Sequence, residues 1–268
     1  MSTPTVFVIG GTGQQGGATI RALLRQGGGF TIRTLSRNPD SPSAKKLSEQ
    51  GVQVFKGDVT DKTSLVAAFQ GVDIVFFMTD NKGPQGPAGE VIQGKSILEA
   101  VHEMGVKRVV FSSVQSADRT ASVGGVPHFE SKAEVEKLIK ESGLQWTILR
   151  PVAFMDFIPL SGTARYMTLG IIGATLGQKK LQFIATEDIG IVAAKAIAAP
   201  DEFSGKTINL AGDELSVDEL RAVFTKVTGQ NTGKAPLPAF LARVMLNYDL
   251  RQMFKVSHPP PDLVPLYL

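Results

Sequence analysis

The chain has 268 residues, of which 43% are hydrophobic and 20% are charged, a composition that supports a full core and excludes intrinsic disorder. It has no cysteine, which excludes disulfides, thiolate metal sites and cysteine nucleophiles. The formal net charge is +3, and the lysines and arginines are scattered, so direct nucleic-acid binding is not expected.

No stretch of the sequence predicts a secretory signal or a membrane span. Met1-Ser-Thr-Pro leads almost directly into the first predicted strand, without a charged segment and an apolar core before it. The most apolar later stretch, Leu169 to Leu176, is too short to cross a bilayer. We therefore expect a cytoplasmic or nuclear protein without membrane association, and we predict no metal site.

The first predicted strand, Val6 to Ile9, runs into a glycine-rich turn and then into a helical pattern. The spacing of Gly10, Gly13 and Gly16 is G-x-x-G-x-x-G, where the usual dinucleotide fingerprint is G-x-G-x-x-G. Gly10 permits the turn, Gly13 lets the backbone approach a pyrophosphate, and Gly16 lets the helix pack tightly on the strand. The alternative is an ordinary glycine turn, but the position between a strand and a helix favours a nucleotide site.

The second predicted strand, Phe30 to Leu35, ends in Ser36-Arg37-Asn38-Pro39. An NAD-binding fold usually carries an acidic residue at this strand tip, about 20 residues beyond the glycine loop, for the ribose hydroxyls. That acid is absent, and Arg37 lies 21 residues after Gly16. A guanidinium suits a 2′-phosphate, which favours NADP over NAD. The alternative is a surface arginine.

The third predicted strand, Val52 to Lys56, precedes two aspartates. Asp58 is predicted either to accept a hydrogen bond from an adenine amino group or to be a turn residue. Asp61 is the predicted N-cap of the next helix. The fourth predicted strand, Val72 to Met78, is almost entirely apolar, as expected inside a parallel sheet covered on both faces.

Strands and helices continue to alternate up to residue 150. The pattern predicts helix Glu90–Met104, strand Arg108–Phe111, a long loop Val114–Pro127, helix His128–Ile139 and strand Gln145–Leu149. This alternation predicts an α/β fold with a doubly wound (Rossmann) parallel sheet, which binds its ligand along the carboxyl edge of the strands. We predict that residues 1–152 form this NADP-binding domain.

The pattern changes after Pro151. Residues 153–268 are predicted to form a smaller mixed α/β lobe over the carboxyl edge of the sheet, with part of its strands returning to that sheet. It begins with a less regular region at Val152–Pro159, followed by a glycine-rich segment, Ser161–Gly177. The later predicted segments are strand Lys180–Ile184, helix Ile189–Ala199, strand Lys206–Leu210, helix Val217–Val227 with a capping box of Ser216 and Glu219, and helix Ala239–Leu246.

Several of these segments together resemble the NmrA-like family, an atypical branch of the short-chain dehydrogenase/reductase superfamily. The resemblance covers roughly residues 5–230 and is carried by residues 10–16, 36–39, 57–58, 128–136, 149–155 and 184–190. It implies NADP(H) bound in an extended form along the sheet edge. It implies that the pyrophosphate contacts Gly11, Thr12, Gly13, Gln14, Gln15 and Gly16, that the 2′-phosphate contacts Arg37, and that the adenine contacts Asp58 and Val59. It also implies that the ribose region of the cofactor lies near Phe77, Met78 and Thr79. At the other end of the cofactor, the nicotinamide ribose would contact Lys132, and the nicotinamide would contact Pro151, Val152 and Phe154.

The sequence departs from the superfamily at the proton donor. Active reductases of the superfamily commonly carry Tyr-x-x-x-Lys, in which the lysine lowers the pKa of the tyrosine and the phenol transfers the proton. Lys132 is present here, but the residue four positions before it is His128. His128 and Lys132 are therefore the candidate catalytic residues. The alternative for His128 is a histidine that caps or packs.

Two functions are consistent with these sequence features. The first is an NADP(H)-binding regulator or redox sensor, which acts through a protein partner and lacks the usual catalytic tyrosine. The second is an NADPH-dependent reductase of a quinone, enone, imine or similar small apolar substrate. In that case Phe154, Met155, Phe157 and Met167 line a flat hydrophobic pocket, or they simply form core. The intact glycines and Arg37 argue against a scaffold that has lost its ligand.

Overall fold

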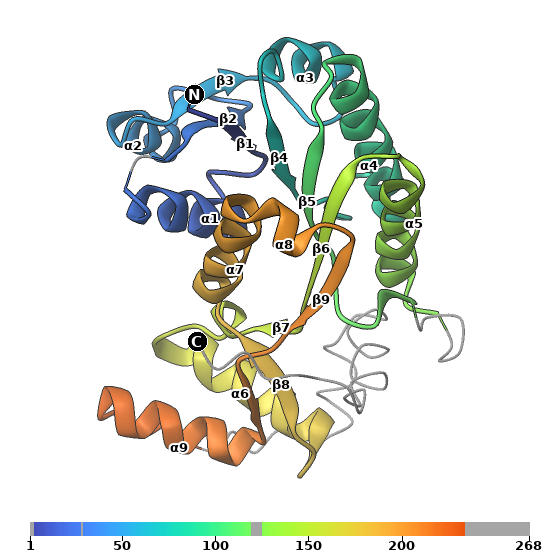
Figure 1. Ribbon diagram of the computed structural model, residues 1–268. Helices are drawn as coiled ribbons and strands as arrows, with labels where there is room; N and C mark the ends of the chain where they lie inside the picture. The colour runs from blue at the N-terminus through green and yellow to red at the C-terminus, as the bar shows by residue number, and fades with distance from the viewer. Residues whose placement is uncertain (1–2, 28, 119–124, 234–268) are drawn as a thin grey trace. The chain divides into compact units, whose positions relative to one another are not determined.

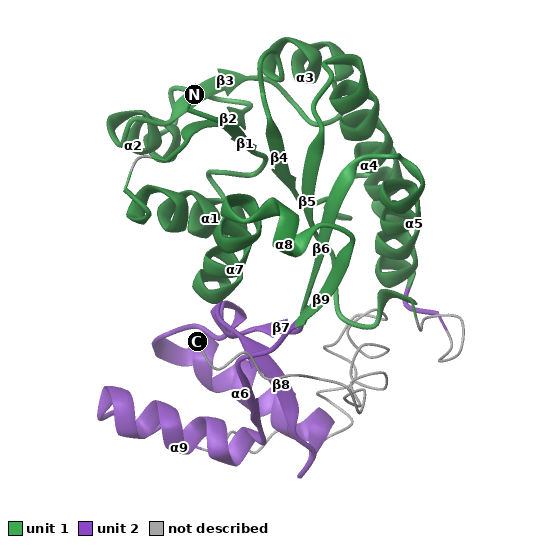
Figure 2. Cartoon of the chain, viewed as in Figure 1, with its two compact units in different colours: residues 1–118, 127–151, 186–209 green, residues 119–126, 152–185, 210–268 purple. Residues whose placement is uncertain are grey.

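The computed structural model describes residues 3–27, 29–118 and 125–233. The predicted helix Ala239–Leu246 and positions 119–124 of the predicted loop Val114–Pro127 lie outside the described residues. The chain divides into two compact units (Figure 2). Unit 1 contains residues 1–118, 127–151 and 186–209, and unit 2 contains residues 119–126, 152–185 and 210–268.

Unit 1 is built around a seven-stranded sheet with the order β3-β2-β1-β4-β5-β6-β9. All pairings among the first six strands of this order are parallel. This is the strand order of a doubly wound fold, and the prediction of a Rossmann sheet is confirmed. The strands are β1 (Thr5–Val8), β2 (Thr31–Ser36), β3 (Gln53–Lys56), β4 (Ile74–Phe77), β5 (Arg108–Ser112), β6 (Gln145–Pro151) and β9 (Lys206–Leu210).

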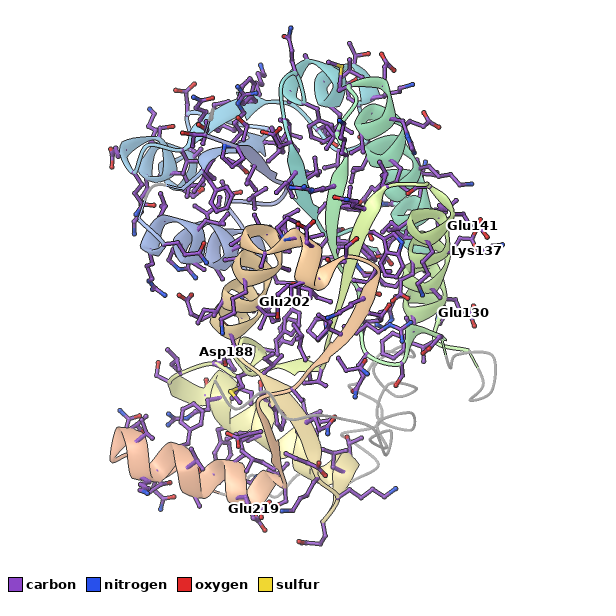
Figure 3. The ribbon with its side chains drawn as sticks, viewed as in Figure 1. Glu130, Lys137, Glu141, Asp188, Glu202 and Glu219 are labelled. Atoms are coloured by element: carbon purple, nitrogen blue, oxygen red, sulfur yellow. The ribbon has the colours of Figure 1, made fainter. Side chains whose placement is uncertain are left out.

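Helices cover both faces of this sheet. Figure 1 shows α1 and α7 packed together on one face and α3, α4 and α5 on the other. The helices are α1 (Gln14–Arg25), α2 (Pro42–Glu49), α3 (Lys62–Ala68), α4 (Gly86–Glu103), α5 (Pro127–Glu141), α7 (Thr186–Ala198) and α8 (Pro200–Phe203). The charged Glu130, Lys137 and Glu141 lie on the outer side of α5 and point away from the sheet (Figure 3).

The residues between these layers are apolar. All four residues of β4 are buried, as the apolar run predicts for a strand covered on both faces. Phe7 packs edge-on against Phe69, with ring centroids 5.0 Å apart, and Phe77 packs against Phe111 at 4.9 Å. Both aromatic contacts join distant segments of the chain: the first links β1 to the end of α3, and the second links β4 to β5.

Two helices begin three or four residues earlier than the sequence pattern predicts. α4 starts at Gly86, four residues before the predicted Glu90. Pro87 does not break the helix, because the first turn of a helix tolerates a residue without a backbone N–H. α7 starts at Thr186, three residues before the predicted Ile189. The predicted N-cap at Asp61 is confirmed, since its carboxylate accepts the Thr63 N–H at 3.0 Å.

Unit 2 contains a three-stranded sheet of order β10-β8-β7, made of β7 (Ala153–Phe154), β8 (Leu181–Ile184) and β10 (Asp213–Leu215). β10 pairs with β8 antiparallel and β7 pairs with β8 parallel, so this small sheet contains both strand directions. The other elements of the unit are the 3-10 helix η2 (Met155–Phe157), α6 (Gly162–Leu176) and α9 (Val217–Thr228).

The glycine-rich segment Ser161–Gly177, for which the sequence predicted no helix, contains the helix α6. Leu169 and Leu176 of this helix are buried in a core with Phe183 and Leu220. Gly173 lies against α9, because a β-carbon at this position would come 3.3 Å from Val217 Cγ1. Tertiary packing of this kind outweighs the poor helix propensity of glycine. None of the described helices is long and apolar enough to cross a membrane.

Candidate functional site

The carboxyl edge of the sheet in unit 1 carries the glycine turn between β1 and α1. Gly10 has a φ of 72°, a left-handed conformation that favours glycine, and the Gly13 N–H donates to the Gly10 carbonyl at 2.8 Å. A β-carbon at Gly16 would lie 2.3 Å from the same carbonyl oxygen. Only glycine fits at position 16, because the first turn of α1 packs directly against the backbone of the glycine turn there.

The loop is held from the neighbouring strand. The Gly11 N–H donates to Thr34 Oγ1 at 3.2 Å, and the Thr34 hydroxyl donates to the Val8 carbonyl at 2.6 Å. α1 then begins at Gln14 with Gly13 as its N-cap, a residue without a side chain to bind the first amides of the helix. Such a helix N-terminus with a glycine turn is the usual binding site for a phosphate. The predicted contact residues Gly10, Gly11, Thr12 and Gln15 all belong to this turn and the first turn of α1.

Two charged residues follow the neighbouring strands at the same edge. Arg37 comes directly after β2 and is exposed, and Asp58 follows β3. The hydrogen bond from the Thr60 N–H lowers the pKa of the Asp58 carboxyl, and burial partly opposes this shift. The Thr60 hydroxyl and the Arg37 charge lower the pKa further. Asp58 Oδ1 accepts from the Thr60 N–H at 2.9 Å and from the Thr60 hydroxyl at 2.8 Å. These contacts fit the turn interpretation of Asp58, and its neighbour Val59 belongs to the same turn.

The end of β4 presents three residues of different kinds. The Phe77 side chain is fully buried in the core, so only its backbone faces the edge of the sheet. Met78 lies over the glycine turn, because its sulfur would be 3.0 Å from a β-carbon at Gly10. Thr79 is buried, and its carbonyl and hydroxyl both contact the Lys132 ammonium.

Lys132 on α5 is fixed by groups from β4 and α4. Its Nζ donates to the Thr79 carbonyl and to Thr79 Oγ1 at 3.2 Å, and it forms an ion pair with Glu90 Oε1 at 2.9 Å. The Glu90 carboxylate also accepts from the Thr79 hydroxyl at 3.0 Å and from the Ser131 hydroxyl. Burial lowers the pKa of Lys132, and the Glu90 carboxylate opposes that shift.

His128 lies one turn before Lys132 on the same helix. The imidazole is half-buried and meets the Phe129 ring edge-on, with centroids 4.6 Å apart. The His128 carbonyl accepts from the Ser131 hydroxyl at 3.1 Å. The two predicted catalytic residues thus lie on one helix at the carboxyl edge of the sheet. The ring contact with Phe129 fits the alternative interpretation of His128 as a packing residue.

The predicted nicotinamide residues are divided along the sequence between the two units. Pro151 ends β6 in unit 1, where its carbonyl accepts the Gln115 N–H at 3.0 Å. Val152 and Phe154 belong to unit 2. The Phe154 ring stacks on the Phe157 ring at 5.3 Å, and Phe157 is 65% exposed. Met155 packs against the core of unit 2, in agreement with the core interpretation of that residue.

Sequence reasoning missed the polar residues that hold the site together. Glu90 is charged, yet it is only 1% exposed and lies on the buried face of α4 together with Gly94, Ile97 and Val101. A charged residue in register with a buried apolar face is a sequence signal for a paired or functional carboxylate. A second missed contact joins Ser112 at the tip of β5 to Gln15, whose side-chain oxygen accepts from the serine hydroxyl at 2.6 Å.

Comparisons with known proteins agree with this architecture. The model of the NmrA-like family matches residues 2–258. Quinone oxidoreductase 2 of Escherichia coli (strain K12) is 29% identical over 259 residues, which cover 94% of this chain and 86% of the relative.

Two crystal structures extend the comparison. An NADPH-dependent quinone oxidoreductase of E. coli in complex with NADPH has a TM-score of 0.73 and 26% sequence identity, over 94% of this chain and 86% of that chain. NmrA, a negative transcriptional regulator in complex with NAD, has a TM-score of 0.74 over 95% of this chain and 81% of that chain. At 18% identity, the likeness to the regulator shows a shared fold alone.

Proposed function

The chain belongs to the NmrA-like family, and we propose on this basis that it binds NADP(H) along the carboxyl edge of its seven-stranded sheet. The observation that carries the proposal is the glycine turn, in which Gly16 lies against the Gly10 carbonyl and Gly13 is the N-cap of α1. Arg37 at the tip of β2 supports NADP(H) over NAD(H), because it stands where an acid would bind the ribose hydroxyls. In this proposal residues 1–152 bind the cofactor, and residues 153–268 recognise a substrate or partner.

A binding experiment tests the cofactor proposal. NADPH and NADH are titrated into the protein, with binding followed by calorimetry, for wild type and for Gly13→Val. We expect Gly13→Val to lose most of the NADPH affinity, because the added side chain occupies the space in which the backbone approaches the pyrophosphate. Gly83→Ala is the matched control, since no atom lies within 4 Å of a β-carbon there. Equal NADPH affinity in all three proteins would contradict the proposal.

For the activity, we propose an NADPH-dependent reductase of a quinone, enone, imine or similar small substrate. The support comes from the E. coli quinone oxidoreductase, whose likeness spans most of both chains. NADPH would donate a hydride to the substrate, and the proton would come from water or from His128. Lys132 would bind the nicotinamide ribose and orient the cofactor, which does not require a tyrosine.

The assay is NADPH oxidation with a panel of quinones, enones and imines. We expect turnover with at least one substrate class and a large loss of kcat/KM in Lys132→Ala. His128→Phe tests the proton source, since it removes the ionisable ring and keeps an aromatic side chain. Absence of turnover across the panel, in protein that binds NADPH, would exclude the reductase and leave the second candidate.

The second candidate is an NADP(H)-dependent regulator that changes its affinity for a protein partner. His128 in place of the usual tyrosine favours it. A regulator requires different partner affinities with and without the cofactor, so the test is quantitative pull-down at saturating and zero NADPH. A partner with the same affinity in both states would contradict this function. Cytoplasmic or nuclear location is part of either proposal and is tested with a fluorescent fusion.

A further inference from the structure

We propose that Glu90 is a positioning residue for Lys132: its buried carboxylate keeps the lysine charged and directs the ammonium to the end of β4. The inference rests on the proposed NADP(H) binding. It assigns a role in that binding to α4, a helix that contains neither the glycine turn nor the position of the Tyr-x-x-x-Lys motif. Glu90 contacts the cofactor only through Lys132 in this proposal, so it is not a catalytic residue.

The contacts of Glu90 are those of a carboxylate built into the fold. Glu90 is 1% exposed, and its two oxygens have separate partners. Oε1 faces the Lys132 ammonium at 2.9 Å and the Thr79 hydroxyl at 3.0 Å, while Oε2 accepts from the Ser131 hydroxyl. A buried carboxylate is stable in a protein when it is paired with a cation and fully hydrogen-bonded, and both conditions hold here.

The surroundings of Lys132 explain why a paired carboxylate matters. The side chain is 12% exposed, and Nζ lies 5.4 Å from the centroid of the Phe111 ring. Burial lowers the pKa of the ammonium, and the opposing contributions come first from Glu90 and then from the more remote Asp80 and Glu136. Glu90 is the carboxylate in direct contact, so its removal leaves a buried ammonium that sheds its proton at lower pH.

A charged Lys132 is what the proposed cofactor requires. An ammonium has three N–H donors and a positive charge that strengthens each hydrogen bond to an oxygen, whereas a neutral amine has two weaker donors. The Thr79 carbonyl and hydroxyl fix the direction of the ammonium, and Glu90 holds its charge. Ser131 orients Glu90 from the same helix as Lys132, so one turn of α5 carries both the cation and a donor to its counterion.

The first experiment measures the Lys132 titration directly in the protein without cofactor. The 13C-labelled lysine side chains are titrated by NMR in wild type, Glu90→Gln and Glu99→Gln, and the Lys132 signal is assigned by its loss in Lys132→Met. We expect the midpoint for Lys132 to fall in Glu90→Gln and to stay unchanged in Glu99→Gln. Glu99 lies on the exposed side of α4, where it pairs with Lys62 at 3.5 Å. An unchanged midpoint in Glu90→Gln would overturn the proposal.

The second experiment is a double-mutant cycle on NADPH affinity, measured from neutral to alkaline pH. Glu90→Gln is expected to weaken binding by about tenfold at alkaline pH, with the loss beginning at lower pH than in wild type. In the Lys132→Met background, the same change is expected to alter affinity less than about twofold. Equal effects of Glu90→Gln in both backgrounds would overturn the positioning role.

The double variant also controls for misfolding, because Glu90→Gln with Lys132→Met leaves no isolated buried charge.

The proposal of NADP(H) binding and the proposal of a positioning role for Glu90 fail in different ways. If wild-type protein does not bind NADPH, the proposed function fails, while the NMR titration still measures the coupling of Glu90 to Lys132. If NADPH binds and the midpoint of Lys132 does not move, only the role of Glu90 is excluded.

Discussion

Gly190 of α7 lies directly against the backbone of Ala18 on α1: a β-carbon at position 190 would come 2.4 Å from the Ala18 carbonyl carbon. The two helices can approach this closely only because residue 190 has no side chain. Glu187, one turn earlier, forms ion pairs with Arg21 at 2.7 Å and Arg25 at 2.6 Å. The segment 184–190, which supports the family resemblance, therefore packs α7 onto the helix that begins at the glycine turn.

Replacement of Gly190 by alanine should destabilise unit 1. The added carbon meets backbone atoms rather than a flexible side-chain end, so the helices must separate. Overpacking of this kind costs about 2–3 kcal/mol in the free energy of unfolding. The measurement is chemical denaturation of wild type and Gly190→Ala. Gly83→Ala is the control, because its β-carbon would meet no atom within 4 Å, and it should leave stability almost unchanged. Equal stability of the two variants would contradict this account of the contact.

Local features of the fold could be predicted from sequence because their partners are close in the chain. The glycine turn, the Asp61 N-cap and the capping box of Ser216 and Glu219 each involve residues only a few positions apart. The alternation of strands and helices predicted a doubly wound parallel sheet, since a parallel sheet needs a crossover between consecutive strands.

The rest depended on contacts between distant positions. Glu90 and Ser131 are separated by 41 residues, and Ser112 and Gln15 by 97. No spacing rule connects such pairs, so the counterion of Lys132 was not foreseen although the lysine was. α6 was missed for a related reason: its glycines disfavour a helix locally, and the packing of Gly173 on Val217 becomes visible only in the folded unit.

A second buried ion pair gives a prediction within helix α5. Glu136 is 2% exposed and accepts two hydrogen bonds from Arg150, from Nε at 2.9 Å and from Nη2 at 2.6 Å. Glu136→Gln removes the charge and leaves the buried guanidinium without this counterion, which should cost about 3 kcal/mol in the free energy of unfolding. Glu141→Gln, at an exposed position on the same helix, should cost less than about 0.5 kcal/mol. Denaturant unfolding of both variants checks this, and a similar small loss for the two would show that the pair contributes little.

Cofactor preference should depend on Arg37, which follows β2, and not on Arg33 within that strand. Under the proposed function Arg37 binds the 2′-phosphate, so Arg37→Gln should weaken NADPH binding by about tenfold or more and leave NADH binding unchanged. Arg33 already donates to the Gln53 side chain at 3.0 Å and to the Gln70 carbonyl at 2.7 Å, so Arg33→Gln should not alter the ratio of the two affinities. Calorimetric titration of both cofactors decides the matter. A parallel loss of NADPH and NADH affinity in Arg37→Gln would count against a 2′-phosphate contact.

The start of α9 should respond to acid at an unusually low pH. The hydrogen bond from Lys180, followed by that from the Ser216 backbone N–H, lowers the pKa of Glu219 from 4.5 to about 2. A carboxyl whose pKa is lower in the folded state stabilises the fold above its unfolded pKa, and this contribution is lost as the pH falls from about 4.5 through about 2. A carboxyl 13C NMR titration should therefore place the Glu219 midpoint near 2, and Lys180→Met should raise it because the 2.8 Å contact with Lys180 is gone. A midpoint near 4.5 in the wild-type protein would mean that the capping box and Lys180 do not hold the carboxylate in solution.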